Sequence, residues 1–221
     1  GIVVNRLGSI TRMGVSQDGL LTITNSVNSS YLVQISVNNT IIAQELVYDG
    51  ASNNQLDLMQ EGLLKDKYGY YTISVIAYDA NAKMLPSSNA IEISGTKLQG
   101  IRSLEISDEG YLIVDIYPDD NTDLRFIVKL EYLGQDYRFN FTANKLSSAT
   151  TYQIALLELF SSIEEYIPLE EKRYNFEIAV GRENYIRSDF VPFEVDYTID
   201  VAPSRARADM ANDYFLFEKR E

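Results

Sequence analysis

One short segment of the chain carries the side chains that a bound cation would need. The segment 117–123, YPDDNTD, offers several carboxylate and amide oxygens, from Asp119, Asp120, Asn121 and Asp123. Calcium takes about six to eight oxygen ligands of these types. The spacing is not that of an EF-hand, and Asp, Asn and Pro are also common turn residues. We therefore interpret the segment as a turn and keep a metal site as the alternative.

The composition excludes the common catalytic groups. The 221-residue chain contains no His and no Cys, so it has no Ser-His-Asp triad, no Cys-His pair and no zinc site built from His or Cys. No glycine-rich phosphate-binding motif occurs. The 32 acidic residues are scattered over alternating segments, and no spacing singles out a carboxylate pair for glycoside hydrolysis. The sequence predicts a protein that is not an enzyme and has no cofactor.

The segment 202–221 departs from the pattern of the rest of the chain and holds the best candidates for binding another protein. A small basic spot and a compact apolar cluster follow one another there, formed by Arg205 and Arg207 and by Tyr214, Phe215 and Phe217. Aromatic clusters anchor short motifs in grooves, and left exposed they promote aggregation. Two interpretations remain open: this tail covers a groove or sheet edge of its own domain, or it binds a neighbouring subunit.

The charge and hydropathy of the chain narrow the class of partner. The net charge is −13, which argues against binding to nucleic acid or to an anionic membrane, because both need clustered Lys and Arg. No stretch approaches the roughly 18 consecutive apolar residues of a membrane-spanning helix. The first residues lack the basic start and apolar core of a signal peptide. We expect synthesis in the cytoplasm, no nucleic-acid binding and no membrane insertion.

The elements that must position these residues are β-strands in two similar halves. The segments 15–23, VSQDGLLTI, and 106–114, ISDEGYLIV, repeat one pattern of an apolar residue, Ser, polar residues, Gly and an alternating apolar run. Alternation with Val, Ile, Tyr and Phe predicts strands. We expect them at 21–23, 31–37, 41–48, 54–59, 70–78 and 90–94, and again at 103–107, 111–117, 124–133, 136–143, 151–159, 174–180 and 190–197. Extra residues at 159–172 in the second half predict a short helix.

Turn residues separate these strands at the spacing of a β-sandwich. The sequence predicts turns at Asp18–Gly19, Asn38–Asn39 and Glu109–Gly110 and another around Gly134. The segment 94–100, SGTKLQG, separates the two halves and is predicted to be a linker. The predicted domains are residues 1–97 and 98–201, followed by the tail 202–221.

Each half resembles a fibronectin type III or immunoglobulin-like domain. In 70–93, Tyr71, Ile73, Val75 and Ala77 match the Tyr-x-Val-x-Val-x-Ala pattern of the sixth strand, F, of type III domains, and Tyr174, Phe176, Ile178 and Val180 occupy the same places in the second half. The segment 116–132 resembles the connection from strand B to strand C. The chain has no Trp and no Cys, and the Leu-x-Pro-x-Thr-x-Tyr corner is not matched, since Leu64 and Leu169 lie at other spacings. The resemblance implies an all-β chain of two tandem antiparallel sandwiches.

Tandem modules without disulfides on an acidic chain look like structural proteins of bacteriophage particles. The hypothesis we favour is a non-enzymatic component of a virion, either a capsid auxiliary or decoration protein or a neck or tail component. Its expected partners are other virion structural proteins, copies of itself among them, and its expected location is the virion. The alternative is a bacterial cell-surface or secreted adhesion module that binds glycan or protein through its loops. Fold analogy carries much of the first hypothesis.

Overall fold

The computed structural model describes residues 10–25, 30–47, 53–78, 90–118, 123–146 and 150–198. The chain divides into two compact units: Gly1–Gln99 with Arg182–Asp189, and Gly100–Gly181 with Phe190–Glu221. Within the described ranges, no helix has the length and apolar character needed to cross a membrane. The domain limits expected from the sequence, 1–97, 98–201 and 202–221, stay a prediction.

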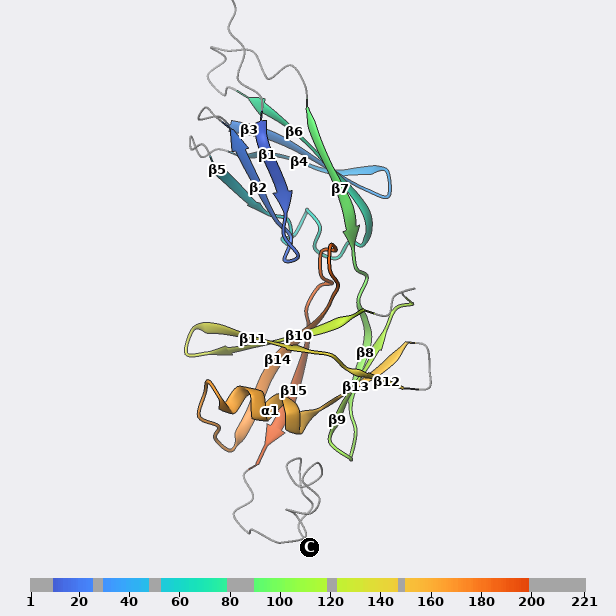
Figure 1. Ribbon diagram of the computed structural model, residues 1–221, viewed down its shortest axis with the longest axis vertical. Coiled ribbons are helices and arrows are strands. Elements are labelled where there is room, and N and C mark those ends of the chain that lie inside the picture. Colours follow the sequence, from blue (N-terminus) through green and yellow to red (C-terminus); the bar gives the residue numbers. More distant parts are fainter. Residues whose placement is uncertain are drawn as a thin grey trace, which may run out of the picture. The chain divides into compact units, whose positions relative to one another are not determined.

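The described part of the first unit is an antiparallel sandwich of two sheets (Figure 1). One sheet has the order β1-β2-β5 and the other β4-β3-β6-β7. The strands are β1 (Ile10–Val15), β2 (Leu20–Asn25), β3 (Ser30–Val37), β4 (Thr40–Val47), β5 (Asn53–Asp57), β6 (Gly69–Tyr78) and β7 (Ile91–Lys97).

The core of the first unit follows from the two-residue period of its strands. Successive side chains of a strand point to opposite faces, so alternate residues of β6 face the other sheet. Tyr71, Ile73, Val75 and Ala77 are all buried there, as the strand F pattern predicts. The predicted turn at Asn38–Asn39 is also present: both residues have positive φ, 49° and 66°, the geometry of the type I′ turn that joins two strands with a right-handed twist.

Strand β7 is longer than the predicted strand at 90–94: it continues through 95–97, which the sequence assigned to the linker. The pairing of β7 with β6 continues to Gly69 and Lys97. Gly95 is required at this point because an added Cβ would lie 2.5 Å from the hydroxyl of Tyr71. The small residues that suggested a linker therefore allow the Tyr71 ring to lie against the strand.

The described part of the second unit repeats this architecture. Its strands are β8 (Ile101–Ile106), β9 (Tyr111–Ile116), β10 (Arg125–Tyr132), β11 (Gln135–Phe141), β12 (Asn144–Lys145), β13 (Thr151–Ala155), β14 (Lys172–Gly181) and β15 (Val191–Tyr197). They form sheets of order β12-β13-β9-β8 and β11-β10-β14-β15. The four residues matched to strand F, Tyr174, Phe176, Ile178 and Val180, are buried on β14.

Both units have the strand order of a fibronectin type III domain. In the first unit β3 pairs with β4 and β6, and β7 pairs with β6 at the edge of the sheet. In the second unit β10 pairs with β11 and β14 in the same way, and β15 pairs with β14 at the edge. The second unit adds the short β12 beside β13. The predicted fold class is confirmed: the chain is all-β, with two tandem immunoglobulin-like, fibronectin type III-like antiparallel sandwiches and a short helix in the second. The predicted tail, 202–221, lies outside the described residues.

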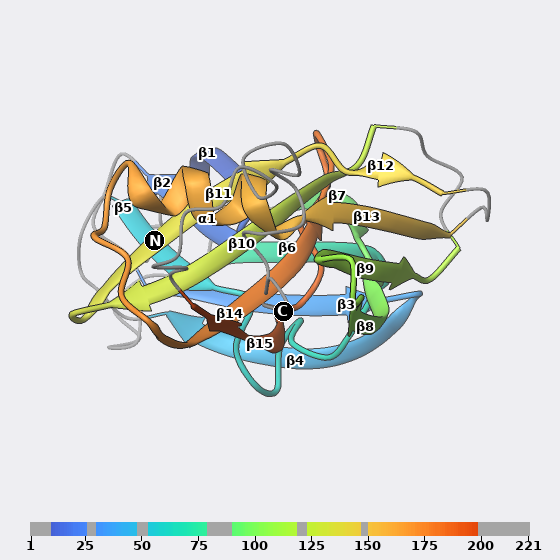
Figure 2. The same cartoon turned by 90° about the horizontal axis from the view of Figure 1, so that it is seen from below.

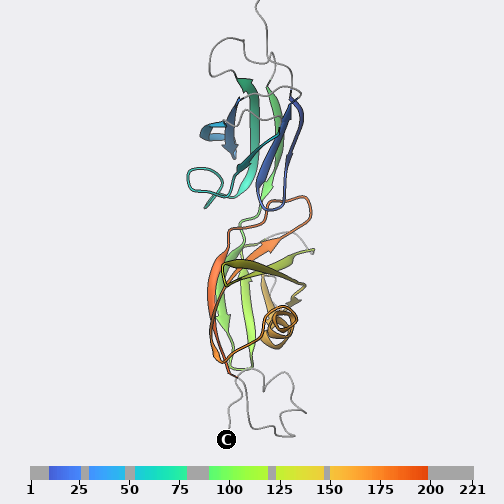
Figure 3. The same ribbon diagram turned by 90° about the vertical axis from the view of Figure 1, so that its left-hand side faces the viewer.

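The predicted short helix is present but begins earlier than expected. Helix α1 spans Leu156–Glu164, whereas the sequence predicts a strand to 159 and the helix after it. Leu156, Leu159, Phe160 and Ile163 are buried, which is the spacing of one helical face. In Figure 3 α1 is seen almost end-on. The Phe160 ring packs against Tyr174, Phe176 and Tyr197 with centroid distances of 5.8, 5.9 and 4.7 Å, so α1 covers the inner face of β14 and β15.

A tyrosine corner is present in the second unit although its sequence motif is not. The Tyr174 hydroxyl accepts a hydrogen bond from the Glu170 backbone N–H at 2.9 Å and lies 3.3 Å from the Glu170 carbonyl oxygen, to which it donates. Such a bond, from a Tyr hydroxyl to backbone a few residues upstream, is a hallmark of this class of sandwich. It fixes the connection from α1 into β14.

Candidate functional site

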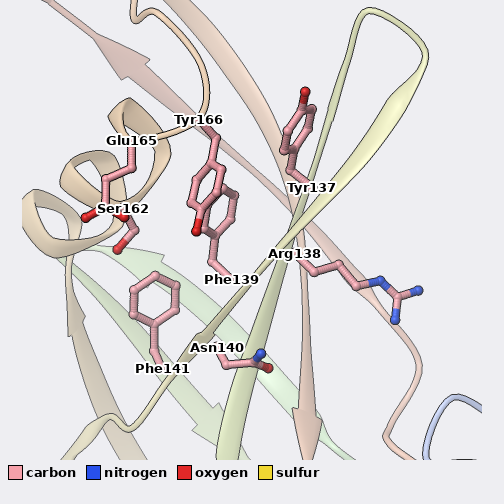
Figure 4. Close-up of a pocket in the computed structure, with 8 residues that line it drawn as sticks. All are labelled: Tyr137, Arg138, Phe139, Asn140, Phe141, Ser162, Glu165 and Tyr166. Atoms are coloured by element: carbon pink, nitrogen blue, oxygen red, sulfur yellow. The ribbon is translucent and has the colours of Figure 1, made fainter.

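A groove in the second unit lies between α1 and β11. Its volume is about 480 Å³, within the range of roughly 300–1,000 Å³ typical of ligand sites. Figure 4 shows its lining side chains, which come from β11 and from the C-terminal end of α1 with the two residues after it. They are Tyr137, Arg138, Phe139, Asn140, Phe141, Ser162, Glu165 and Tyr166. In both Figure 1 and Figure 2, β11 runs beside α1.

Local sequence explains why this groove is aromatic. Strand β11 alternates exposed polar residues with Phe139 and Phe141, which are buried. The helix turns its apolar face inward, which leaves Ser162 half-buried and Glu165 exposed beside the groove. Tyr166 follows the helix and is 66% exposed, and its ring lies 6.1 Å from that of Phe139. The bottom of the groove is therefore aromatic, and the side that carries Tyr166 is exposed to solvent.

Strand β11 lies at the edge of its sheet. In the order β11-β10-β14-β15 it has one neighbouring strand, β10, among the described residues. Edge strands present backbone groups to which a further strand can be added. An aromatic groove beside such an edge can bind an extended peptide, with backbone hydrogen bonds for affinity and side-chain pockets for specificity. The sequence predicts a strand at 136–143, but it gives no sign that α1 forms the opposite side of a groove beside it.

The residues predicted to bind a partner or a metal fall mostly outside the described residues. Arg205, Arg207, Tyr214, Phe215 and Phe217 all lie outside them, and so do Asp119, Asp120 and Asn121. Asp123 is described and exposed, just before β10. Among the described residues no group of three or more His, Cys, Asp or Glu side chains could hold a metal ion. The predicted contact residues and the alternative metal site therefore stay predictions.

The first unit contains a buried ammonium group that the sequence did not reveal. Lys97 is 2% exposed, and its Nζ donates hydrogen bonds to the carbonyl oxygens of Leu64 and Lys67 at 2.8 and 2.6 Å. The third donor hydrogen goes to Asp189 Oδ2 at 2.8 Å. Burial lowers the pKa of Lys97, and the contact with Asp189 opposes this. An ammonium with three acceptors has its full hydrogen-bonding capacity used, so we assign it a structural role.

The segment 182–189 supplies Asp189 and a second ion pair to the first unit. Arg187 is 8% exposed, and its Nε donates to Asp18 Oδ1 at 2.8 Å. Its backbone N–H donates to the Gln17 carbonyl oxygen at 2.8 Å. In sequence this segment connects β14 to β15, yet its contacts place it in the first unit. A strand-to-strand loop of the second repeat gives no sequence signal for such packing.

Comparison with known proteins identifies no family for this chain. No family model matches it, and no curated protein matches it. Among solved structures it is similar to a two-domain fibronectin type III segment of chicken tenascin, at 15% identity and a TM-score of 0.28, with 86% of this chain and 98% of that one covered. It is also similar to the FN1–FN3 domains of chicken CNTN1, at 14% identity and a TM-score of 0.29, with 87% of this chain and 66% of that one covered. Because both scores are below 0.5, the fold assignment rests on the sheet order described above.

Proposed function

We propose that this chain is a non-enzymatic protein-binding module of a larger assembly. The observation that carries the proposal is the groove between β11 and α1, where an aromatic floor lies beside a sheet edge. Both features favour an extended polypeptide as ligand, because a strand added at the edge satisfies backbone groups while its side chains enter the groove. Without His or Cys in the chain, acyl-transfer and zinc chemistry of the common kinds are excluded.

Within this class, the assembly we propose is a bacteriophage virion. The chain would be a capsid auxiliary or decoration protein or a neck or tail component, located in the virion and bound to other virion structural proteins. Support comes from tandem sandwiches without a single Cys and from a net charge of −13. A strong net charge keeps a protein soluble at high local concentration and favours docking on a basic surface.

The contact residues we propose outside the groove are those of the tail. Arg205 and Arg207 would pair with acidic groups, and the aromatic side chains of Tyr214, Phe215 and Phe217 would anchor the contact. Buried aromatic residues with Arg are the side chains that most often dominate the binding energy of an interface. Replacement of the three aromatic residues therefore removes most of the proposed contact.

A binding experiment with matched variants tests this function. Purified chain is mixed with particles isolated from a lysate of its source and depleted of the chain, and the bound fraction is measured after sedimentation. Wild type should bind at a fixed ratio, and the triple variant Tyr214→Ser, Phe215→Ser, Phe217→Ser should bind at least about tenfold more weakly, the equivalent of about 1.4 kcal/mol. Tyr68→Ser replaces a Tyr that is 50% exposed in the first unit and serves as the control.

Equal binding of the triple variant and wild type would contradict the role given to the tail. Failure of the wild-type chain to bind any particle fraction would contradict the proposal that the assembly is a virion. It would favour the adhesion module instead.

A further inference from the structure

The groove reaches the outer edge of β11 as well as the face that carries Phe139 and Phe141. Five consecutive residues, 137–141, line the groove. Neighbouring side chains of a strand point to opposite faces, so a cavity that touches all five extends past one face to the backbone at the edge of the strand. A ligand in this groove is therefore placed where an added strand would pair with β11.

The register of β11 identifies the backbone groups that face such a ligand. Tyr132 and Gln135 close the hairpin between β10 and β11 around Leu133 and Gly134, which have φ of 52° and 77°. In a two-residue hairpin the closing pair exchanges both backbone hydrogen bonds, and every second residue along the strand then turns its N–H and C=O away from the partner. By this alternation the backbone groups of Asp136 and Asn140 point to the outer edge.

The chain leaves the second sandwich at the end of the sheet where this groove begins. Tyr197, the last residue of β15, pairs with Lys172 at the start of β14. The Lys172 ammonium lies 5.4 Å from the ring centroid of Tyr132, next to the β10–β11 hairpin. Thr198 therefore lies at the same end of the sheet as Tyr137, and the tail follows it in the sequence.

The length of chain between this point and the aromatic cluster of the tail is sufficient to reach the groove. A strand added outside β11 lies four strand positions from β15, or roughly 19 Å at about 4.8 Å per strand. The stretch 199–212 spans up to roughly 46 Å when extended at about 3.3 Å per residue. A connection of a dozen or more residues is also what a strand parallel to its neighbour requires.

We propose that residues 213–217 of this chain, DYFLF, occupy the β11–α1 groove of the same molecule. The segment lies along β11 as an added strand, and its alternate aromatic side chains pack on Phe139 and Tyr166. Attachment to the same chain gives the segment an effective concentration in the millimolar range, which favours this occupant over a second copy. The inference concerns the free protein and goes beyond the proposed function, because it holds whatever assembly the chain joins.

A single tryptophan tests the proposal, because the chain contains none. Phe215→Trp places the only indole of the full-length protein in the segment and keeps its aromatic character. In the free protein we expect blue-shifted emission and acrylamide quenching several-fold weaker than that of a free indole. Both properties should be the same over a hundredfold dilution, since the contact is within one molecule.

Tyr166→Ser in the Phe215→Trp background decides where the indole lies. Tyr166 is 66% exposed, so its replacement leaves the core of the second unit intact, and an unchanged thermal unfolding curve verifies this. We expect red-shifted emission and quenching that approaches that of free indole. Tyr68→Ser, the matched control, should leave the emission blue-shifted.

Three results would overturn the proposal. Solvent-exposed emission in Phe215→Trp alone would show that the segment is not covered. Blue emission that persists in Tyr166→Ser would place the segment elsewhere, and burial that is lost on dilution would identify a second copy as the occupant. None of these results depends on binding to a particle, so failure here is distinct from failure of the proposed function.

Discussion

At the scale of single residues, Lys97 is the most deeply buried charged side chain among the described residues. Burying an ammonium group is unfavourable unless its hydrogen-bonding capacity is satisfied. Two backbone carbonyl oxygens and the Asp189 carboxylate satisfy it here. The carbonyls of Leu64 and Lys67 belong to the connection that precedes β6, so the ammonium also holds this connection against β7.

Lys97→Met should therefore destabilise the first unit. It removes the donor of three hydrogen bonds and leaves a carboxylate and two carbonyls without it, for which we expect a loss of about 2–4 kcal/mol in the free energy of unfolding. Urea unfolding followed by circular dichroism measures it. Lys65→Met, which removes an exposed ion pair with Glu61, should cost no more than about 0.5 kcal/mol. Equal losses in the two variants would contradict the role assigned to Lys97.

Asp115 gives a prediction about pH. Burial acts to raise its pKa, but hydrogen bonds from Thr150 and Arg102 act in the opposite direction and the pKa is lowered. The Thr150 hydroxyl donates at 2.8 Å and the Arg102 Nε at 2.7 Å. A lowered folded-state pKa means that the unfolded state takes up the proton first, so the stabilisation is present above the unfolded value of about 3.9. It is lost as the pH falls through the folded value.

Asp115→Asn should accordingly lower the melting temperature at pH 7 and have a diminishing effect as the pH falls below about 3.9. Calorimetry at several pH values measures the difference from wild type. Glu105→Gln, at an exposed position of the neighbouring strand β8, is the control. A difference that stays constant down to pH 2 would show that Asp115 does not titrate in this way.

At the scale of elements, strands and turns could be predicted because their signals are local. Asn38–Asn39 has the residue type that positive φ requires, and β6 and β14 each alternate over a full strand. The start of α1 could not be predicted in this way, since Leu156 continues the alternation of β13 and the helix is selected by packing of Phe160 on distant rings. The groove depends on that helix, so the side of the groove that α1 and Tyr166 form could not be predicted from a local pattern.

The tyrosine corner offers a comparison between the two repeats. Tyr174→Phe removes a hydroxyl that both accepts from and donates to the Glu170 backbone, and we expect a loss of about 1–2 kcal/mol in the free energy of unfolding. Tyr71→Phe is the matched change on β6 in the first unit and should cost about 0.5 kcal/mol or less. Chemical denaturation measures the loss in the free energy of unfolding for both variants. A smaller loss for Tyr174 than for Tyr71 would contradict a structural role for this corner.

At the scale of the whole molecule, deletion of the tail separates its effect on folding from its effect on binding. Deletion of 203–221 should leave both sandwiches folded, because every strand that the structure describes ends by Tyr197, and it should abolish or weaken assembly with the partner. Circular dichroism and the particle-binding experiment measure the two effects. Unfolding of the second sandwich on deletion would show that the tail is part of its core.

Tail and groove also bear on how the chain joins an assembly. If residues 213–217 occupy the groove of the free protein, a partner that binds either surface must compete with this contact. Loss of the contact makes the aromatic cluster and the edge of β11 accessible together.

Sedimentation of the native protein distinguishes a virion component from an adhesion module. A lysate of its source is spread on a density gradient, and the chain is followed by antibody. We expect the chain to sediment with intact particles at a constant ratio to the major particle protein in every fraction. Recovery with cell envelopes, or free in the medium, would contradict it.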